Sequence, residues 1–133
     1  MSTILLVEDN ELNREMLSRR LGRRGYTVDC AVNGEEALAM ARARLPDLIL
    51  MDIRLPDISG CDVTRTLKAD SRTCHIPVIA LSAHAMDAHR HDAISAGCDD
   101  YDTKPVDIDR LVAKMRALLI ESASRSHAND LAA

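Results

Sequence analysis

Apolar and polar positions along the chain form two kinds of segment that alternate. Short strand-like runs begin near Ile4, Thr27, Leu48, Pro77 and Asp99, and a stretch compatible with an amphipathic helix follows each. Parallel strands need crossover connections, usually helices, so this alternation favours a parallel sheet that is covered on both faces. The pattern therefore predicts an α/β fold built from five βα units.

Cap and turn residues indicate where one of the helices begins and ends. Asn33 and Glu36 have the spacing of a capping box, which predicts a helix start. Pro46 predicts that this helix stops by Arg44 or Leu45, because a residue before proline avoids the helical conformation.

Length and composition predict a single domain. A chain of 133 residues with 47% hydrophobic content is large enough for one buried core. We assign residues 1–121 to this domain. From Ser122 onward the helical pattern gives way to Ser, Ala and polar residues, so we expect residues 122–133 to form a flexible tail or the start of a linker.

Charge and cysteine usage argue against several classes of protein. The net charge is −4, with acidic and basic residues mixed along the chain, so no strong field favours direct contact with nucleic acid. The apolar run from Ile4 to Val7 is too short for a secretory or membrane segment. The four cysteines lack C-x-x-C spacing and suit small, partly buried hydrophobes. We therefore expect a cytoplasmic protein with no membrane partner.

Polar residues stand where four of the strand-like runs end. They are Glu8 and Asp9, Asp52, Ser82 and Lys104. In an open parallel sheet ligands bind outside the carboxyl ends of the strands, so these residues are expected to meet. Three carboxylates, a hydroxyl and an ammonium suit a divalent cation together with a phosphoryl group. The sequence thus predicts a phosphorylation switch.

Each of these residues also has an ordinary structural interpretation. Asp52 follows an apolar run typical of a central strand and suits a nucleophile that forms an aspartyl phosphate, but Asp is also common in turns. Glu8 and Asp9 suit a Mg²⁺ site, and they also suit a helix cap. Ser82 and Lys104 are unremarkable alone. The order of the residues along the chain, rather than any single one, carries the functional prediction.

The chain resembles a response-regulator receiver domain of the two-component systems, from about Thr3 to Glu121. The matching stretches are Leu6 to Asn10, Met51-Asp52 with Leu55-Pro56 and Gly60, Leu81 to Ala83, Asp100-Tyr101, and Lys104-Pro105. The resemblance implies a flavodoxin-like fold with strand order 2-1-3-4-5 and a cis peptide bond before Pro105.

The same resemblance implies a role for each polar residue. Asp52 would accept a phosphoryl group from a histidine of a sensor histidine kinase or a histidine phosphotransfer protein. Glu8, Asp9 and Asp52 would bind Mg²⁺, and Lys104 and Ser82 would hold the phosphoryl oxygens. The protein would then catalyse only its own phosphorylation and slow self-dephosphorylation, and would not be an enzyme in the wider sense.

The switch is expected to follow from the added charge. A phosphoryl group on Asp52 would draw Ser82 toward it, and Tyr101, which matches the family's switch aromatic, would fill the space left behind. The change would reach the surface formed by the fourth helix, fifth strand and fifth helix. The alternative is that Tyr101 packs permanently on the surface of an edge strand.

Three further positions lie near the expected site. Arg54 and His84 stand two residues beyond Asp52 and Ser82 and would tune the lifetime of the phosphoryl group. Arg54 has no acceptor that could orient a hydrolytic water, which favours slow self-dephosphorylation. Asp102 departs from the family pattern, in which an apolar residue is common, so the burial of the fifth strand is less firmly predicted.

Two alternatives compete with a stand-alone regulator. The chain could be the N-terminal receiver part of a larger response regulator, although the start at Met1 favours a natural beginning. The second alternative is a metal-dependent hydrolase that forms an aspartyl phosphate. Haloacid-dehalogenase-like enzymes place a second Asp as general acid two residues after the nucleophile, and Arg54 holds that position here.

Overall fold

The computed structural model of the chain describes residues 2–83 and 87–132, and its side chains over 2–83 and 90–123. Strands and helices alternate in the order β1 (Thr3–Val7), α1 (Glu11–Arg23), β2 (Thr27–Ala31), α2 (Gly34–Arg44), β3 (Leu48–Asp52), α3 (Gly60–Ala69), β4 (Val78–Ser82), α4 (Asp87–Ser95), β5 (Asp100–Thr103) and α5 (Ile108–Ala132). The five strands form one parallel sheet in the order β2-β1-β3-β4-β5. The predicted flavodoxin-like fold and its strand order are confirmed.

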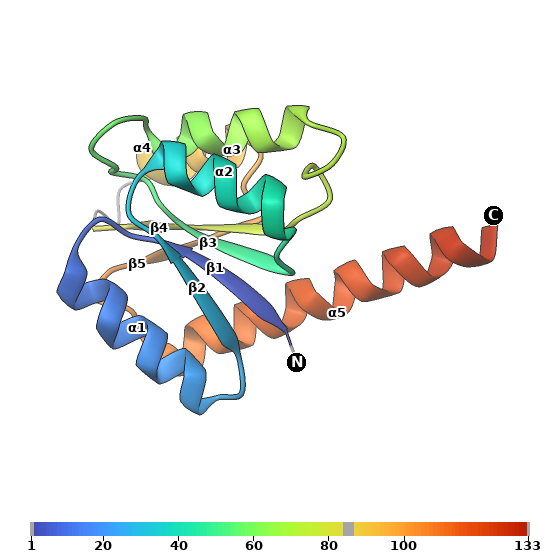
Figure 1. The fold of residues 1–133 in the computed structure, drawn as a ribbon, viewed down its shortest axis with the longest axis horizontal. Coiled ribbons are helices and arrows are strands. Elements are labelled where there is room, and N and C mark those ends of the chain that lie inside the picture. Colours follow the sequence, from blue (N-terminus) through green and yellow to red (C-terminus); the bar gives the residue numbers. More distant parts are fainter. Residues whose placement is uncertain (1, 84–86, 133) are drawn as a thin grey trace.

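The helices cover both faces of the sheet because the central strands are apolar on both sides. Helices α2, α3 and α4 lie on one face, and α1 and α5 lie on the other (Figure 1). Along β1 the side chains alternate, so that Leu5 and Val7 face the first group of helices while Ile4 and Leu6 face the second. All four are at most 1% exposed, and each such burial contributes about 1.5–3 kcal/mol.

Side-chain caps define the starts of the helices nearest the carboxyl edge of the sheet. Asn33 Oδ1 accepts from the backbone N–H of Glu36 at 2.8 Å, as the capping-box spacing predicted. Helix α2 ends at Arg44, where Leu45 adopts a left-handed conformation (φ 46°) directly before Pro46. Asn10 caps α1 in the same way, accepting from Asn13 N–H at 3.0 Å.

Helix α5 is longer than the sequence pattern indicated. It continues through the residues that we expected to form a flexible tail and ends at Ala132, extending beyond the sheet (Figure 1). Residues 108–132 contain neither Gly nor Pro, so nothing in this stretch interrupts helical hydrogen bonding. The boundary of the domain at residue 121 stays a prediction. No helix in the described part of the chain combines the length and apolar character that a membrane span requires.

Candidate phosphorylation site

The polar residues predicted to meet do so at the carboxyl edge of the sheet. Glu8 and Asp9 follow β1, Asp52 is the last residue of β3, Ser82 is the last residue of β4, and Lys104 follows β5. The parallel register places the ends of β1, β3, β4 and β5 side by side, because Val7 pairs with Met51, Asp52 with Leu81 and Ser82 with Thr103.

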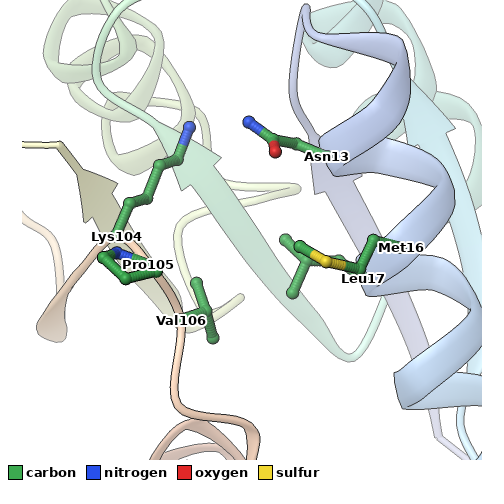
Figure 2. Close-up of a pocket in the computed structure, with 6 residues that line it drawn as sticks. All are labelled: Asn13, Met16, Leu17, Lys104, Pro105 and Val106. Atoms are coloured by element: carbon green, nitrogen blue, oxygen red, sulfur yellow. The ribbon is translucent and has the colours of Figure 1, made fainter.

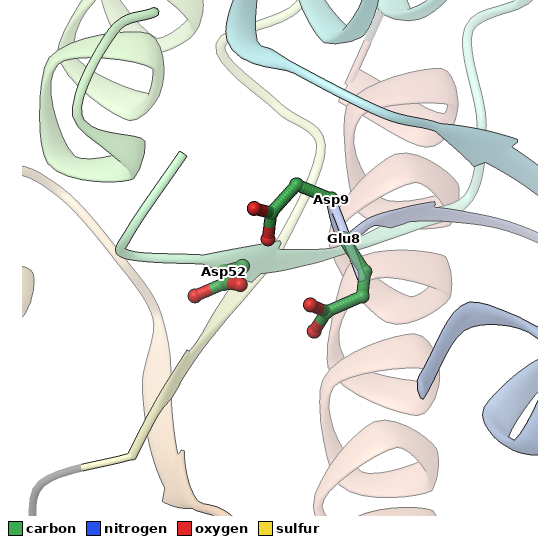
Figure 3. A group of neighbouring side chains, drawn as sticks. All are labelled: Glu8, Asp9 and Asp52. Atoms are coloured by element: carbon green, nitrogen blue, oxygen red, sulfur yellow. The ribbon is translucent and has the colours of Figure 1, made fainter. Parts of the chain in front are cut away.

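Three carboxylates surround the end of β3 (Figure 3). Glu8 and Asp52 are 1% and 4% exposed, whereas Asp9 is exposed. One oxygen from each carboxylate lies within 4.8 Å of the other two. Such a cluster of hard oxygen donors matches the chemistry of Mg²⁺, which takes one or two protein carboxylates and keeps several waters. The three residues therefore fit the ion that the sequence predicted.

Lys104 supplies the positive charge beside these acids. Its Nζ donates to Glu8 Oε2 at 2.6 Å and to Asp52 Oδ2 at 3.1 Å. Its backbone N–H donates to the carbonyl of Ser82 at 2.8 Å, which ties the β5–α5 loop to β4. The following bond to Pro105 is cis, as the resemblance implied. Lys104 thus joins the ends of three strands.

Burial and charge shift two pKa values in this site. Burial raises the pKa of Glu8, the Asp52 charge adds to the rise, and the hydrogen bond from Lys104 offsets only part of it. For Lys104, burial lowers the pKa, but the Glu8 hydrogen bond and the charges of Asp52 and Glu8 outweigh it, so the net direction is upward. The Lys104 ammonium therefore keeps its proton at neutral pH.

The loop after Asp52 folds tightly against the strand that carries it. Asp52 Oδ1 accepts from the backbone N–H of Arg54 at 3.0 Å, and Gly60 N–H donates to the Ile53 carbonyl at 2.9 Å. A Cβ on Gly60 would overlap the backbone carbonyl of Asp52 and approach Ile53 Cα to 2.9 Å. Only glycine allows this close approach of α3 to the site.

Arg14 and Asp57 also shape the site, although we did not predict a role for either. Arg14 Nη1 donates to the carbonyls of Glu8 and Asp9 at 2.9 and 3.0 Å, which holds the turn that presents both acids. Asp57, in the loop after β3, accepts from the backbone N–H groups of Gly34 and Glu35 at 2.8 and 3.0 Å. These bonds lower the pKa of Asp57 and join its loop to the start of α2.

The residues predicted to switch or tune the site have different surroundings. Ser82 is buried, at 4% exposed. Tyr101 is also buried, at 8% exposed, and belongs to the core beneath α2, α3 and α4, so it does not pack on the surface as the alternative held. The side chain of Arg54 is exposed. His84 lies outside the described residues.

An apolar pocket of about 350 Å³ adjoins Lys104. Asn13, Met16 and Leu17 of α1 line one side, and Lys104, Pro105 and Val106 line the other (Figure 2). Leu12 and Met16, one turn apart on the same helix, are 76% and 39% exposed and add apolar surface next to this pocket.

Comparisons with known proteins agree with this arrangement. The family model described as "Response regulator receiver domain" matches residues 4–116. The chain is 42% identical over 117 residues to the polar-differentiation response regulator DivK of Brucella anthropi, covering 88% of this chain and 95% of that protein.

Two solved structures resemble the fold closely. A putative response regulator from Chloroflexus aurantiacus has a TM-score of 0.87 and 32% identity, covering 90% of this chain and 98% of its own. The receiver domain of the sensor histidine kinase PA1611 from Pseudomonas aeruginosa has a TM-score of 0.83 and 35% identity, covering 89% and 97% respectively. In that structure a magnesium ion is coordinated in the active-site cleft. With a family match over most of its length and a carboxylate pocket at the expected edge of the sheet, the chain belongs to the response-regulator receiver family, whose members receive phosphoryl groups from histidine kinases and act as regulators rather than as enzymes.

Proposed function

We propose that this chain is a phosphorylation-dependent switch of a two-component or phosphorelay system, with Asp52 as the phosphoryl acceptor. The main support is the shared contact of Lys104 Nζ with Glu8 and Asp52, beside carboxylate oxygens that lie within 4.8 Å of one another. A buried acid at the end of a central strand, with a fixed cation beside it, is suited to attack on phosphorus.

The transfer itself requires little covalent chemistry from the protein. The phosphorus–nitrogen bond of a phosphohistidine breaks while a phosphorus–oxygen bond to Asp52 forms, and the imidazole leaves with the electron pair. Arg54 N–H holds one oxygen of Asp52, and the Lys104 ammonium neutralises charge that develops on the phosphoryl oxygens. The Ser82 hydroxyl then donates to one of those oxygens.

Glu8, Asp9 and Asp52 are the residues that would hold Mg²⁺. When bound, the ion neutralises charge on the transferring group and lowers repulsion among the acids. The magnesium ion in the PA1611 receiver domain supports this assignment.

The phosphoryl donor is a sensor histidine kinase or a histidine phosphotransfer protein. The pocket between α1 and the β5–α5 loop lies beside Lys104, and the exposed Leu12 and Met16 offer apolar area for docking. A partner that covers this area would bring its histidine to Asp52 and exclude water. We place this exchange in the cytoplasm.

Phosphorylation would be transmitted through Ser82 and Tyr101. Both lie on neighbouring strands, β4 and β5, and both are buried, so a shift of Ser82 toward the phosphoryl group changes the packing around Tyr101. The surface formed by α4, β5 and α5 would then differ between the two states and serve as the output surface.

A small-molecule donor tests the proposal without a partner protein. The purified chain is incubated with acetyl phosphate and Mg²⁺, and its intact mass is recorded with and without hydroxylamine. We expect an adduct of one phosphoryl group that hydroxylamine removes, that needs Mg²⁺, and that Asp52→Ala abolishes. An absent adduct, or one that persists in Asp52→Ala, would contradict the proposal.

A further inference from the structure

Asp102 is a buried carboxylate in the strand that leads to Lys104. It lies in β5 opposite Leu81 of β4 and is 3% exposed. A charged side chain in such a place is costly unless cations and hydrogen-bond donors compensate it. The groups that compensate the charge of Asp102 would not be needed if this position held an apolar residue.

One oxygen of Asp102 receives all of its hydrogen bonds. Arg110 Nε and Nη2 lie 3.0 and 2.8 Å from Oδ1, and the backbone N–H of Thr103 donates to the same atom at 2.8 Å. Lys114 Nζ stands 3.9 Å from it. The other oxygen, Oδ2, is buried with no hydrogen-bond partner in the described part of the chain. Loss of Arg110 would thus leave a buried charge with little compensation.

The ion pair between Asp102 and Arg110 joins β5 to α5 on either side of the loop that carries Lys104. Asp102 lies two residues before Lys104, and Arg110 lies in the first turn of α5. Lys114, one turn further along α5, donates to the carbonyl of Tyr101 at 2.6 Å and adds a second tie between α5 and β5. The β5–α5 loop is consequently held at both ends by charged contacts.

We infer that Arg110 is a positioning residue, which acts through Asp102 to hold the β5–α5 loop so that Lys104 reaches Asp52 and Glu8. The inference rests on the proposed function, because the benefit of a fixed Lys104 is faster phosphoryl transfer. Lysine is a point charge on a flexible stem, so its backbone must be fixed for its ammonium to stay near the reacting atoms. Arg110 itself touches none of them.

The test compares Arg110→Gln with Arg116→Gln, which removes the same charge from an exposed position on the same helix. The rate of Asp52 phosphorylation by acetyl phosphate is measured at saturating Mg²⁺, together with Mg²⁺ affinity and thermal stability. We expect Arg110→Gln to slow phosphorylation by about 3- to 10-fold, with Mg²⁺ affinity unchanged, because a small displacement of a charged group reduces transfer sharply. Arg116→Gln should react as the parent does, and Arg110→Lys should recover part of the rate.

A double variant separates positioning from stability. Asp102→Val combined with Arg110→Gln removes the ion pair without leaving a buried charge, so it should be folded even if Arg110→Gln alone is not. We expect the double variant to be folded and still slow. A folded double variant that reacts at the parent rate, or an Arg110→Gln variant that is indistinguishable from Arg116→Gln, would overturn the inference.

Lysine NMR distinguishes failure of this inference from failure of the proposed function. The chain has three lysines, Lys68, Lys104 and Lys114, so their side-chain resonances are readily assigned. If the parent forms no phosphoryl adduct, the proposed function is wrong. The positioning role of Arg110 is then tested by the Lys104 resonance alone. A shift of that resonance in the double variant but not in Arg116→Gln supports the positioning role. An unchanged resonance overturns it.

Discussion

Lys104 and Glu8, which are 96 positions apart in the sequence, form a partly buried ion pair with 2.6 Å between Nζ and Oε2. Glu8 is 1% exposed, and the backbone N–H of Asn10 donates to its other oxygen at 3.2 Å. The two residues therefore hold the β1–α1 and β5–α5 loops together across the site. The acid that we propose as a Mg²⁺ ligand is therefore also the ion-pair partner of the lysine that we propose to hold the phosphoryl oxygens.

The turn that presents Glu8 and Asp9 depends on Arg14. Its guanidinium bonds both of their carbonyls, so Arg14→Gln should loosen the turn and weaken Mg²⁺ binding about 10-fold, as is usual when residues that orient metal ligands are lost. Isothermal titration with Mg²⁺ measures the effect. Arg20→Gln, on an exposed face of the same helix, is the control and should bind Mg²⁺ as the parent does. Equal affinities of the two variants would show that Arg14 does not support the site.

Gly60 is required by the approach of α3 to Asp52. In Gly60→Ala the new Cβ overlaps the Asp52 carbonyl, so we expect the free energy of unfolding to fall by about 1–3 kcal/mol and phosphorylation to slow. Gly22→Ala is the control. Gly22 lies in α1, and a Cβ added there meets nothing within 4 Å, so this substitution should raise the free energy of unfolding by about 0.5–1 kcal/mol. Urea denaturation of both variants measures these changes. A stable, normally reactive Gly60→Ala would contradict the prediction.

The positions of the main site residues could be predicted because the burial of the apolar strands determines where the strands end. Apolar runs on both sides of β1, β3 and β4 require a covered parallel sheet, and such a sheet brings Glu8, Asp52 and Ser82 to one edge. Lys104 reaches the same edge because β5 is parallel to its neighbour. The order of these residues along the chain was therefore sufficient to predict that they meet at one edge of the sheet.

Arg14, Asp57 and Arg110 could not be predicted in the same way. Arg14 and Asp57 bond to backbone groups whose positions are set only once the turns have folded. Arg110 binds Asp102, a strand residue whose burial was uncertain from the sequence. A charged residue on a helix or loop usually indicates a solvated surface, and no spacing separates these three from the rest. Similarly, the composition of residues 122–133 indicated a flexible tail or the start of a linker, whereas α5 continues to Ala132 because no Gly or Pro interrupts it.

Asp57 should make stability depend on acid pH. The backbone N–H groups of Gly34 and Glu35 hold its pKa below the usual 3.8, so the folded state binds a proton less readily than the unfolded state does. The resulting stabilisation is present above the unfolded pKa and is lost as pH falls through the lower folded pKa. Asp57→Asn should weaken this loss when unfolding is followed from neutral to acid pH.

The control for Asp57 is Asp62→Asn, which alters an exposed acid at the start of α3. Its unfolding curve should keep the same acid dependence as the parent. If Asp57→Asn and the parent lose stability in parallel below pH 4, the bonds to α2 do not contribute as argued.

Arg54 should lengthen the life of the aspartyl phosphate. Its exposed side chain lies two residues beyond Asp52 and has donors but no acceptor with which to orient an attacking water. Arg54→Asn introduces an acceptor, so its phosphorylated form should decay faster. Loss of the phosphoryl mass with time, after removal of the donor, measures both rates. Equal decay of the parent and the variant would be evidence against this role.

Tyr101 should report the change of state directly. The chain has no Phe or Trp and two tyrosines, so ring resonances of Tyr101 and Tyr26 can be followed separately by NMR. The two rings lie in different layers, because Tyr101 packs beneath α2, α3 and α4 while Tyr26 packs on the α1 and α5 side. Addition of beryllofluoride with Mg²⁺, which mimics the phosphoryl group, should shift the Tyr101 resonances and leave those of Tyr26 in place.

Ser82→Ala tests the route by which the signal reaches Tyr101. Without its hydroxyl, residue 82 can no longer donate to the new oxygens, so beryllofluoride should no longer shift Tyr101 even where it still binds Asp52. Fluorine NMR of the bound mimic verifies occupancy. If Tyr101 responds equally in the parent and in Ser82→Ala, the ring senses the phosphoryl group by another path. If it responds in neither, its buried position is permanent and the output surface must change without it.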